Sequence, residues 1–314
     1  MITISHKTKQ FFLVTIKILI VCGAIYYIYW HFAGDKNIHF NEIKAYFSFK
    51  MVLILMVLSG LNWFFEILKW KHLVSSFQTI SFLKAAEQSL GSLTAAVFTP
   101  NRLGEYGAKA LYFNKENNKQ IVFLNFLGNG SQMLVTTFFG VLGFFLSSIT
   151  SSTSMFWFSS KINLKILLPT LFIFFALMYY FKNMEFYGFS LKKLIKKIGS
   201  FSIKFHLINL FFSAFRYLLF SFQFLLLLTV FDIEIALKTA IATIFIMYFL
   251  ASIIPAINFM DVAIKGSVAL FLFSLLQVNE MKIASIVAIM WVFNLVIPLL
   301  IGCFCVWRFK PIVR

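Results

Sequence analysis

Three charged residues, Arg102, Glu105 and Lys109, follow Pro100 at the end of a long apolar stretch. Because proline cannot continue the preceding helix, a new helix is expected to start near Asn101 with several N–H groups that lack intrahelical partners. Such groups attract anions, and the forked guanidinium of Arg102 suits bidentate contact with a phosphate, while Glu105 holds it in place from the same helix face. The alternative is a buried Arg102–Glu105 pair that only fixes helix packing. The residues of the predicted anion site are Pro100, Asn101, Arg102, Gly104, Glu105 and Lys109.

A second apolar stretch is interrupted in the same way, after Pro255. Asn258 is suited to cap the helix that follows. Asp261 and Lys265 are four residues apart, in the favourable order for an ion pair on a helix. The residues of this second predicted site are Pro255, Asn258, Asp261, Lys265 and Gly266.

Further charges lie within other apolar runs. Arg216 is near the middle of one run, too deep to reach the membrane surface easily, so it needs a buried partner. Glu105, Asp261 or a substrate phosphate could supply that partner, and Arg216 is therefore a third predicted substrate-binding position. Glu66 and Lys69 lie one helical turn apart near the end of another run, which predicts an ion pair at the membrane interface.

The composition predicts that these residues are surrounded by a lipid bilayer. Of 314 residues, 61% are hydrophobic and only 12% are charged, with a mean hydropathy of +0.88. Several apolar runs are about 20 residues long, enough to cross a hydrocarbon core about 30 Å thick. We therefore expect an all-α polytopic membrane protein with a single transmembrane domain over residues 1–314. The predicted full spans are Phe11–Trp30, Met51–Trp70, Ile121–Leu146, Lys165–Phe181, Leu207–Phe231 and Ala284–Trp307.

Two further segments are apolar but broken, Phe82–Phe113 at Pro100 and Ala236–Gln277 at Pro255. We interpret them as re-entrant helical hairpins, and the alternative is eight or more full spans. The order of elements repeats as span, span, broken hairpin and span, over residues 11–147 and 165–308. Three crossings in each half is an odd number, which predicts two inverted repeats with broken helices near the midplane, an arrangement that recurs in transporters.

The net charge of +17 follows the topology rather than a nucleic-acid surface, because the lysines cluster at the ends of segments. Sixteen lysines and arginines fall on one predicted side and seven on the other, which predicts that both termini are cytoplasmic. The basic linker 182–204 contains apolar residues at 191, 194, 195 and 198. This spacing predicts an amphipathic helix on an anionic leaflet, with a plain cytoplasmic loop as the alternative.

The remaining residue types argue against catalysis. Cys22, Cys303 and Cys305 lie in apolar stretches without metal-ligand spacing, and the five histidines share no helix face. The sequence has no paired carboxylates and no Ser-His-Asp arrangement. We therefore expect no enzyme activity, no metal and no cofactor, and an intramembrane lipid transferase is the less favoured alternative.

The two breaks resemble those of the lysylphosphatidylglycerol synthase transmembrane-region family, also called the flippase-like domain family. The family motif Pro-x-Arg-x-Gly-Glu reads here Pro100-Asn101-Arg102-Leu103-Gly104-Glu105. In the second motif Pro255 and Gly266 fit, whereas Lys265 stands where the family usually has Glu. The resemblance implies an inner-membrane protein that handles lipids, in the best-known members by flipping an aminoacylated phospholipid. The aminoacyl-transfer domain of those members is not expected, because the chain ends at Arg314.

These observations predict transport, flipping or presentation of an anionic phospholipid or a lipid-linked precursor across the bacterial cytoplasmic membrane. The expected partners are anionic membrane lipids, and nucleic acid is not expected. The alternative function is a non-catalytic scaffold or accessory subunit for an envelope lipid-modifying enzyme or glycosyltransferase.

Overall fold

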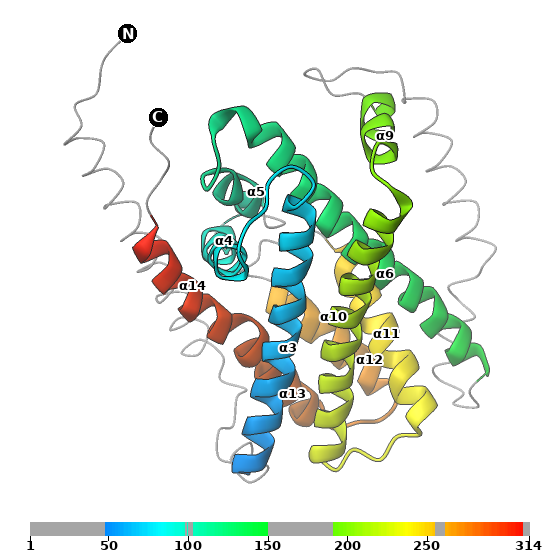
Figure 1. Cartoon of the computed structure of the whole chain (residues 1–314). Coiled ribbons are helices and arrows are strands. Elements are labelled where there is room, and N and C mark those ends of the chain that lie inside the picture. The colour runs from blue at the N-terminus through cyan, green and yellow to red at the C-terminus, as the bar shows by residue number, and fades with distance from the viewer. Residues whose placement is uncertain (1–47, 98, 100–102, 150–190, 255–260, 310–314) are drawn as a thin grey trace.

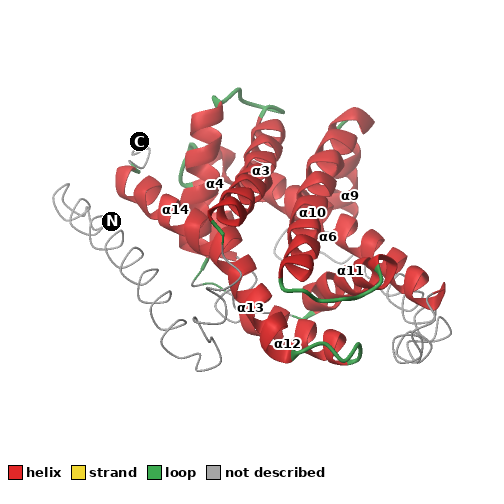
Figure 2. Ribbon diagram, turned by 90° about the horizontal axis from the view of Figure 1, so that it is seen from below, coloured by secondary structure: helices red, strands yellow, loops and turns green. Residues whose placement is uncertain are grey.

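The computed structural model describes residues 48–97, 99, 103–149, 191–254 and 261–309. Within these ranges the chain forms helices and no strand (Figures 1 and 2). The helices are α3 (Phe49–Val74), α4 (Phe82–Ala96), α5 (Leu103–Ala110), η1 (Lys115–Asn117), α6 (Asn118–Ile149), α9 (Leu191–Gly199), α10 (Ile203–Val230), α11 (Leu237–Ile253), α12 (Asp261–Ser274), α13 (Glu280–Trp291), η4 (Val292–Val296) and α14 (Ile297–Arg308).

Four helical stretches are long and apolar enough to cross a membrane, so the chain is a multi-pass membrane-embedded protein. They run from 26 to 33 residues and contain the predicted spans that begin at Met51, Ile121, Leu207 and Ala284. The predicted spans Phe11–Trp30 and Lys165–Phe181 lie outside the described residues. The stretches are Phe49–Val74, Lys115–Ser147, Ile203–Val230 and Glu280–Arg308.

Serine side chains fix where several helices begin. The hydroxyls of Ser48, Ser81 and Ser202 accept hydrogen bonds from backbone N–H groups in the first turns of α3, α4 and α10. Each hydroxyl satisfies one of the donors that a helix start leaves without an intrahelical partner. The start of each of these helices is therefore determined by a residue beside it in the sequence.

Both predicted breaks are present. The first apolar segment divides into α4, of 15 residues, and α5, of 8 residues. The second divides into α11, of 17 residues, and α12, of 14 residues. All four are shorter than the roughly 20 residues that a crossing needs. In Figure 1, α4 and α5 lie towards the upper end of the molecule with α9, whereas α11 and α12 lie towards the lower end.

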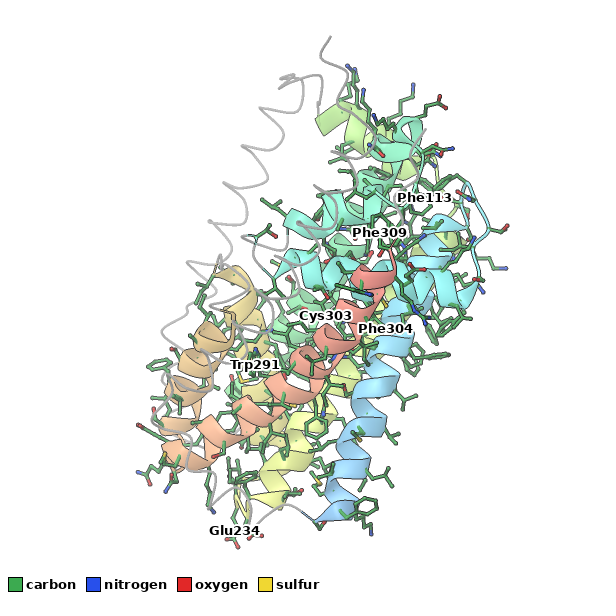
Figure 3. All side chains as sticks on the ribbon, turned by 90° about the vertical axis from the view of Figure 1, so that its left-hand side faces the viewer. Phe113, Glu234, Trp291, Cys303, Phe304 and Phe309 are labelled. Atoms are coloured by element: carbon green, nitrogen blue, oxygen red, sulfur yellow. The ribbon has the colours of Figure 1, made fainter. Side chains whose placement is uncertain are left out.

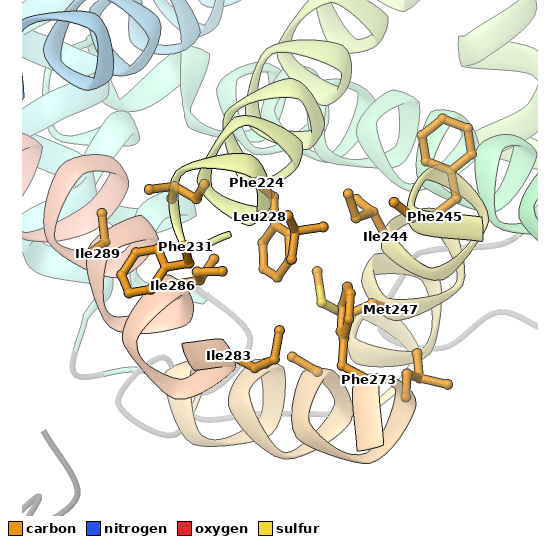
Figure 4. Close-up of a cluster of buried hydrophobic side chains, with 14 of the residues drawn as sticks. Phe224, Leu228, Phe231, Ile244, Phe245, Met247, Phe273, Ile283, Ile286 and Ile289 are labelled. Atoms are coloured by element: carbon orange, nitrogen blue, oxygen red, sulfur yellow. The ribbon is translucent and has the colours of Figure 1, made fainter. Parts of the chain in front are cut away.

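Three pairs of helices carry the main packing: α3 against α10, α4 against α14, and α11 against α6. Small residues allow the closest approaches, as is common where membrane helices meet. A Cβ on Gly302 of α14 would lie 2.3 Å from the carbonyl oxygen of Leu90 in α4, and one on Gly140 of α6 would lie 2.4 Å from Phe249 of α11. Figure 4 shows the largest apolar cluster, which joins α10 through Phe224 and Leu228 to α11, α12 and α13.

The last long stretch contains a π-helix, η4, which Pro298 explains. Proline lacks the N–H that would bond the carbonyl of Asn294 in an α-helix or that of Phe293 in a π-helix. Both carbonyls are taken by side chains of α3 instead: Ser59 donates to Phe293 O, and Trp63 Nε1 donates to Asn294 O at 3.1 Å. The widened turn is therefore fastened to α3. Figure 3 shows the stretch running from Trp291 past Cys303 and Phe304.

The amphipathic helix in the basic linker is confirmed as α9. Its lysines are exposed, but its apolar face differs from the predicted leaflet contact. Leu194 and Ile198 pack against an apolar cluster of the protein that includes Phe123, and Ile195 remains 62% exposed. Lys197 Nζ lies 4.4 Å from the ring centroid of Phe123. The helix thus docks on the protein and leaves its lysines accessible to a membrane surface.

We expect Gly302→Ala to destabilise the protein, because the carbonyl of Leu90 is backbone and cannot move aside cheaply. Overpacking of this kind costs about 1–3 kcal/mol. Thermal unfolding of the purified protein measures the effect. The control is Gly60→Ala, where the new Cβ meets nothing within 4 Å. Equal unfolding temperatures for the two variants would contradict the close α4–α14 contact.

Candidate functional site

Arg216 of α10 is held by an acidic residue that the sequence did not single out as its partner. Its Nη1 donates to Glu66 of α3, and its Nε donates to Asn62 Oδ1 at 3.1 Å. Glu66 also accepts from Lys69 Nζ at 2.8 Å. The predicted pairing of Glu66 with Lys69 is confirmed. The two residues are only 8% and 2% exposed. Their face of α3 packs against α10, so the pair is enclosed by protein.

Amide side chains extend this ion cluster to two more elements, η4 and α6. Asn62 Nδ2 donates to Asn294 Oδ1 at 3.0 Å, and Asn294 Nδ2 donates to Gln223 Oε1 at 2.8 Å. Gln132 Oε1 of α6 accepts from Arg216 Nη1 at 3.5 Å. Asn294 belongs to the π-helix, so the widened turn places one of these amides in the network. Sequence reasoning missed the network, although uncharged amides inside apolar spans were a visible signal.

Glu105 and Lys109 form a second buried cluster. Lys109 Nζ donates to Glu105 Oε1 at 2.7 Å and to Asn125 Oδ1 at 2.8 Å, and it lies 4.1 Å from the ring centroid of Trp70. The two charged residues are 4% and 1% exposed. Lys109 is therefore enclosed by its partners and does not line the cavity described below. The described ionic partner of Glu105 is Lys109, whereas the predicted pairing of Glu105 with Arg102 involves a residue outside the described part.

A threonine side chain accepts a hydrogen bond from a backbone N–H at the start of α5. The N–H of Gly104 donates to Thr99 Oγ1 at 2.7 Å. A Cβ on Gly104 would lie 2.8 Å from the carbonyl oxygen of Ala95 and from Thr99 Oγ1, so the absence of a side chain at this glycine allows α4 and α5 to approach closely. Pro100, Asn101 and Arg102 lie outside the described residues.

A cavity of about 630 Å³ lies between the two broken segments. Tyr106 of α5 reaches it from the first, and Ser252 of α11 and Lys265 of α12 reach it from the second. Two of the predicted site residues, Arg216 and Lys265, line it, although they are 49 positions apart in the sequence. Its polar lining residues are Asn62, Tyr106, Asn129, Gln132, Thr136, Arg216, Tyr248, Ser252, Lys265 and Asn294.

The other residues of the second predicted site lie near or outside this lining. Gly266 follows Lys265 in α12, and a Cβ there would make an ordinary contact with Val287, at 3.8 Å. Asp261 begins α12, and its side chain lies outside the described part. Pro255 and Asn258 also lie outside the described residues.

The lining suits a negatively charged ligand with a large apolar part. Among the described lining residues, Arg216 and Lys265 are charged, both positively, and none is acidic. Much of the remaining wall is apolar or aromatic, including Trp63, Met247 and Trp291. The described residues contain no group of His, Cys, Asp and Glu that could hold a metal ion. What the cavity offers is binding: cationic side chains among polar and apolar groups that line one concave space.

Comparison of the chain with models of known protein families and with curated proteins gives no match.

We expect Glu66→Gln to destabilise the protein strongly, because the positive charges of Arg216 and Lys69 then lose their shared carboxylate. Removing one partner from a buried ion pair costs about 3–5 kcal/mol. The double variant Glu66→Gln/Lys69→Gln should recover part of the loss, since it removes one of the stranded charges.

Thermal unfolding in detergent measures these changes, with the exposed Glu234→Gln as the matched control. An unfolding temperature for Glu66→Gln equal to that of the control would show that Glu66 does not neutralise the cluster.

Proposed function

We propose that the chain binds an anionic lipid in the cavity between its two broken segments and moves or presents it across a bacterial cytoplasmic membrane. The observation that carries the proposal is the joint lining by Arg216 and Lys265, two cations from distant helices inside a membrane-embedded protein. Ionisable residues at such depth are rare and mark pathways or binding sites.

Charge supports an anionic ligand. In the described contacts Arg216 and Lys69 both pair with the carboxylate of Glu66, which places two cations on one acidic group. Lys265 of α12 adds another cation to the lining of the cavity. A phosphate that enters would make charge-assisted hydrogen bonds in a region of low dielectric constant, where they are stronger than in water.

The surroundings support a lipid rather than a soluble anion. Ile253 and Ile254 line the cavity at the end of α11 and are also 55% and 43% exposed on the outer surface. In a membrane-embedded protein this apolar surface offers acyl chains a lateral route beside the cavity. A headgroup could thus lie against Arg216 and Lys265 while its chains remain in the bilayer.

The packing supports the two inverted halves that a transporter of this kind would use. Under the proposed repeat, α3, α4 and α6 correspond to α10, α11 and α13–α14. The α4–α14 and α11–α6 contacts are then equivalent, and α3–α10 packs across the centre. Asn62 and Arg216 are 154 residues apart, as are the first residues of α3 and α10, and they bond to each other.

A second pair of positions follows the same relation. Gln132 lies fourteen residues after the start of α6, and Asn294 lies fourteen residues after the start of α13. Gln132 bonds Arg216, and Asn294 bonds Asn62. The polar network therefore contains two pairs of corresponding residues, as expected at the centre of two related halves. Rocking of such halves around a central site is a known means of alternating access.

The resemblance to the flippase-like domain family agrees with this proposal, and we propose membership of that family. Both hairpins are then re-entrant, the first opening from the cytoplasm and the second from outside. Six full spans and two cytoplasmic termini complete the arrangement.

We expect Lys265→Gln to slow lipid movement about tenfold or more, because a hydrogen bond to a charged group contributes about 1.5–3 kcal/mol. The assay reconstitutes the full chain in phosphatidylcholine vesicles that contain phosphatidylglycerol with a fluorescent acyl chain. Dithionite, which cannot cross the bilayer, then reports how fast the probe reaches the outer leaflet.

The control is Lys238→Gln, an exposed lysine of α11. Equal rates for the two variants would refute a role for Lys265. A wild-type protein that moves no probe but retains an envelope enzyme through purification would favour the scaffold function.

We expect Leu103→Cys and Ala263→Cys to react with a membrane-impermeant thiol reagent from opposite faces of the membrane. Both side chains are exposed, and they begin the second halves of the two broken segments. The background replaces the native cysteines with alanine, and labelling is compared in sealed right-side-out and inside-out vesicles. Labelling of both positions from one face would contradict inverted halves.

A further inference from the structure

Building on the proposed function, we propose that the headgroup bound in this cavity is a glycosyl phosphate, with one or two sugar rings attached to the lipid phosphate. The aminoacylated phospholipid that the family resemblance implies does not fit the same wall.

Charge excludes an amine-bearing head. The described lining holds Arg216 and Lys265 and no carboxylate, and the nearby Glu66 is occupied by Arg216 and Lys69. A lysyl or other aminoacyl head would bring an ammonium group beside these two cations, and no described lining residue is acidic. Unpaired charge in a desolvated site is costly, so such heads are rejected.

The hydrogen-bond acceptors that line the cavity favour a ligand with hydroxyl groups. A phosphate accepts hydrogen bonds and has no use for amide oxygens, which it would repel. In the described contacts Asn129 Nδ2 donates to Tyr106 OH at 3.3 Å, which leaves the Asn129 carbonyl oxygen and the Tyr106 phenolic proton for a ligand. Gln132 and Thr136 lie on α6 beside Asn129 and also line the cavity. Sugar hydroxyl groups are neutral and can both donate to the Asn129 oxygen and accept from the Tyr106 hydroxyl, so a polyol fits this wall.

Size and shape favour rings over a bare phosphate. The cavity volume of about 630 Å³ is in the range that holds whole small molecules and far exceeds one phosphate group. Trp63 and Trp291 present aromatic surface to the same space. The indole of Trp63 is fixed by its bond to Asn294 O, so its face is preorganised to pack on the C–H face of a ring.

The test measures binding of matched probes to the full chain in phosphatidylcholine nanodiscs, because a sugar-headed detergent would compete. The first probe is citronellyl phosphate, and the second is the same lipid with glucose on its phosphate. We expect the glucosylated probe to bind at least about tenfold more tightly, since a site built to bond hydroxyls discriminates against the analogue that lacks them.

Variants separate the sugar from the phosphate. Asn129→Leu should abolish the preference for glucose while leaving the affinity for citronellyl phosphate unchanged, and Thr136→Val, which keeps the side-chain shape, should reduce that preference. Lys265→Gln should weaken both probes. The control is Gln78→Leu, at an exposed position outside the cavity, and thermal unfolding confirms that each variant is folded.

Equal affinity for the two probes would overturn the glycosyl assignment and leave the anionic-lipid function standing. Failure of both probes to bind would instead count against the proposed function itself. Tighter binding of lysyl-phosphatidylglycerol than of the glucosylated probe would overturn the charge argument. Glucose 1-phosphate that binds as tightly as the glucosylated lipid would show a soluble sugar phosphate as the ligand and overturn the lipid assignment.

Discussion

The carboxylate of Glu66 is the constraint on which the polar interior depends. It is shared by Arg216 across the α3–α10 contact and by Lys69 along its own helix. Within the described residues, two cations thus share one carboxylate at the contact between the two central helices. Arg216 also lines the adjacent cavity, so the packing of these helices and the charge of the cavity wall both depend on this cluster.

Within the described residues, the hydrophobic pattern was sufficient to predict four long helices and the division of two further apolar segments. The spans that begin at Met51, Ile121, Leu207 and Ala284 coincide with long helices, and both proline-marked segments divide as expected. Runs of apolar residues encode these features locally, since their length must match the bilayer. Arg216 and Lys265 were also recognisable, because charge in an apolar run is conspicuous in any single sequence.

The pairing of charges could not be predicted with the same success. Glu66 looked interfacial because it lies near the end of its run, yet it faces α10 and receives Arg216. Which face of a helix a residue occupies depends on neighbours that lie about 150 positions away. Lys109 likewise counted as a ligand-binding cation, but Asn125 and Trp70 enclose it. Long-range contacts decided both cases, and local spacing carries no information about them.

The π-helix at η4 has a geometric consequence for the last crossing. A one-residue insertion turns all later side chains by about 100° relative to an unbroken α-helix. Val287, Met290 and Trp291 can therefore line the cavity while Gly302, on the far side of the insertion, still meets Leu90 of α4. In an uninterrupted α-helix, the cavity-lining residues and Gly302 could not both face their present neighbours. The π-helical turn therefore changes which face of the last crossing points where, so that its first part lines the cavity and its second part packs against α4.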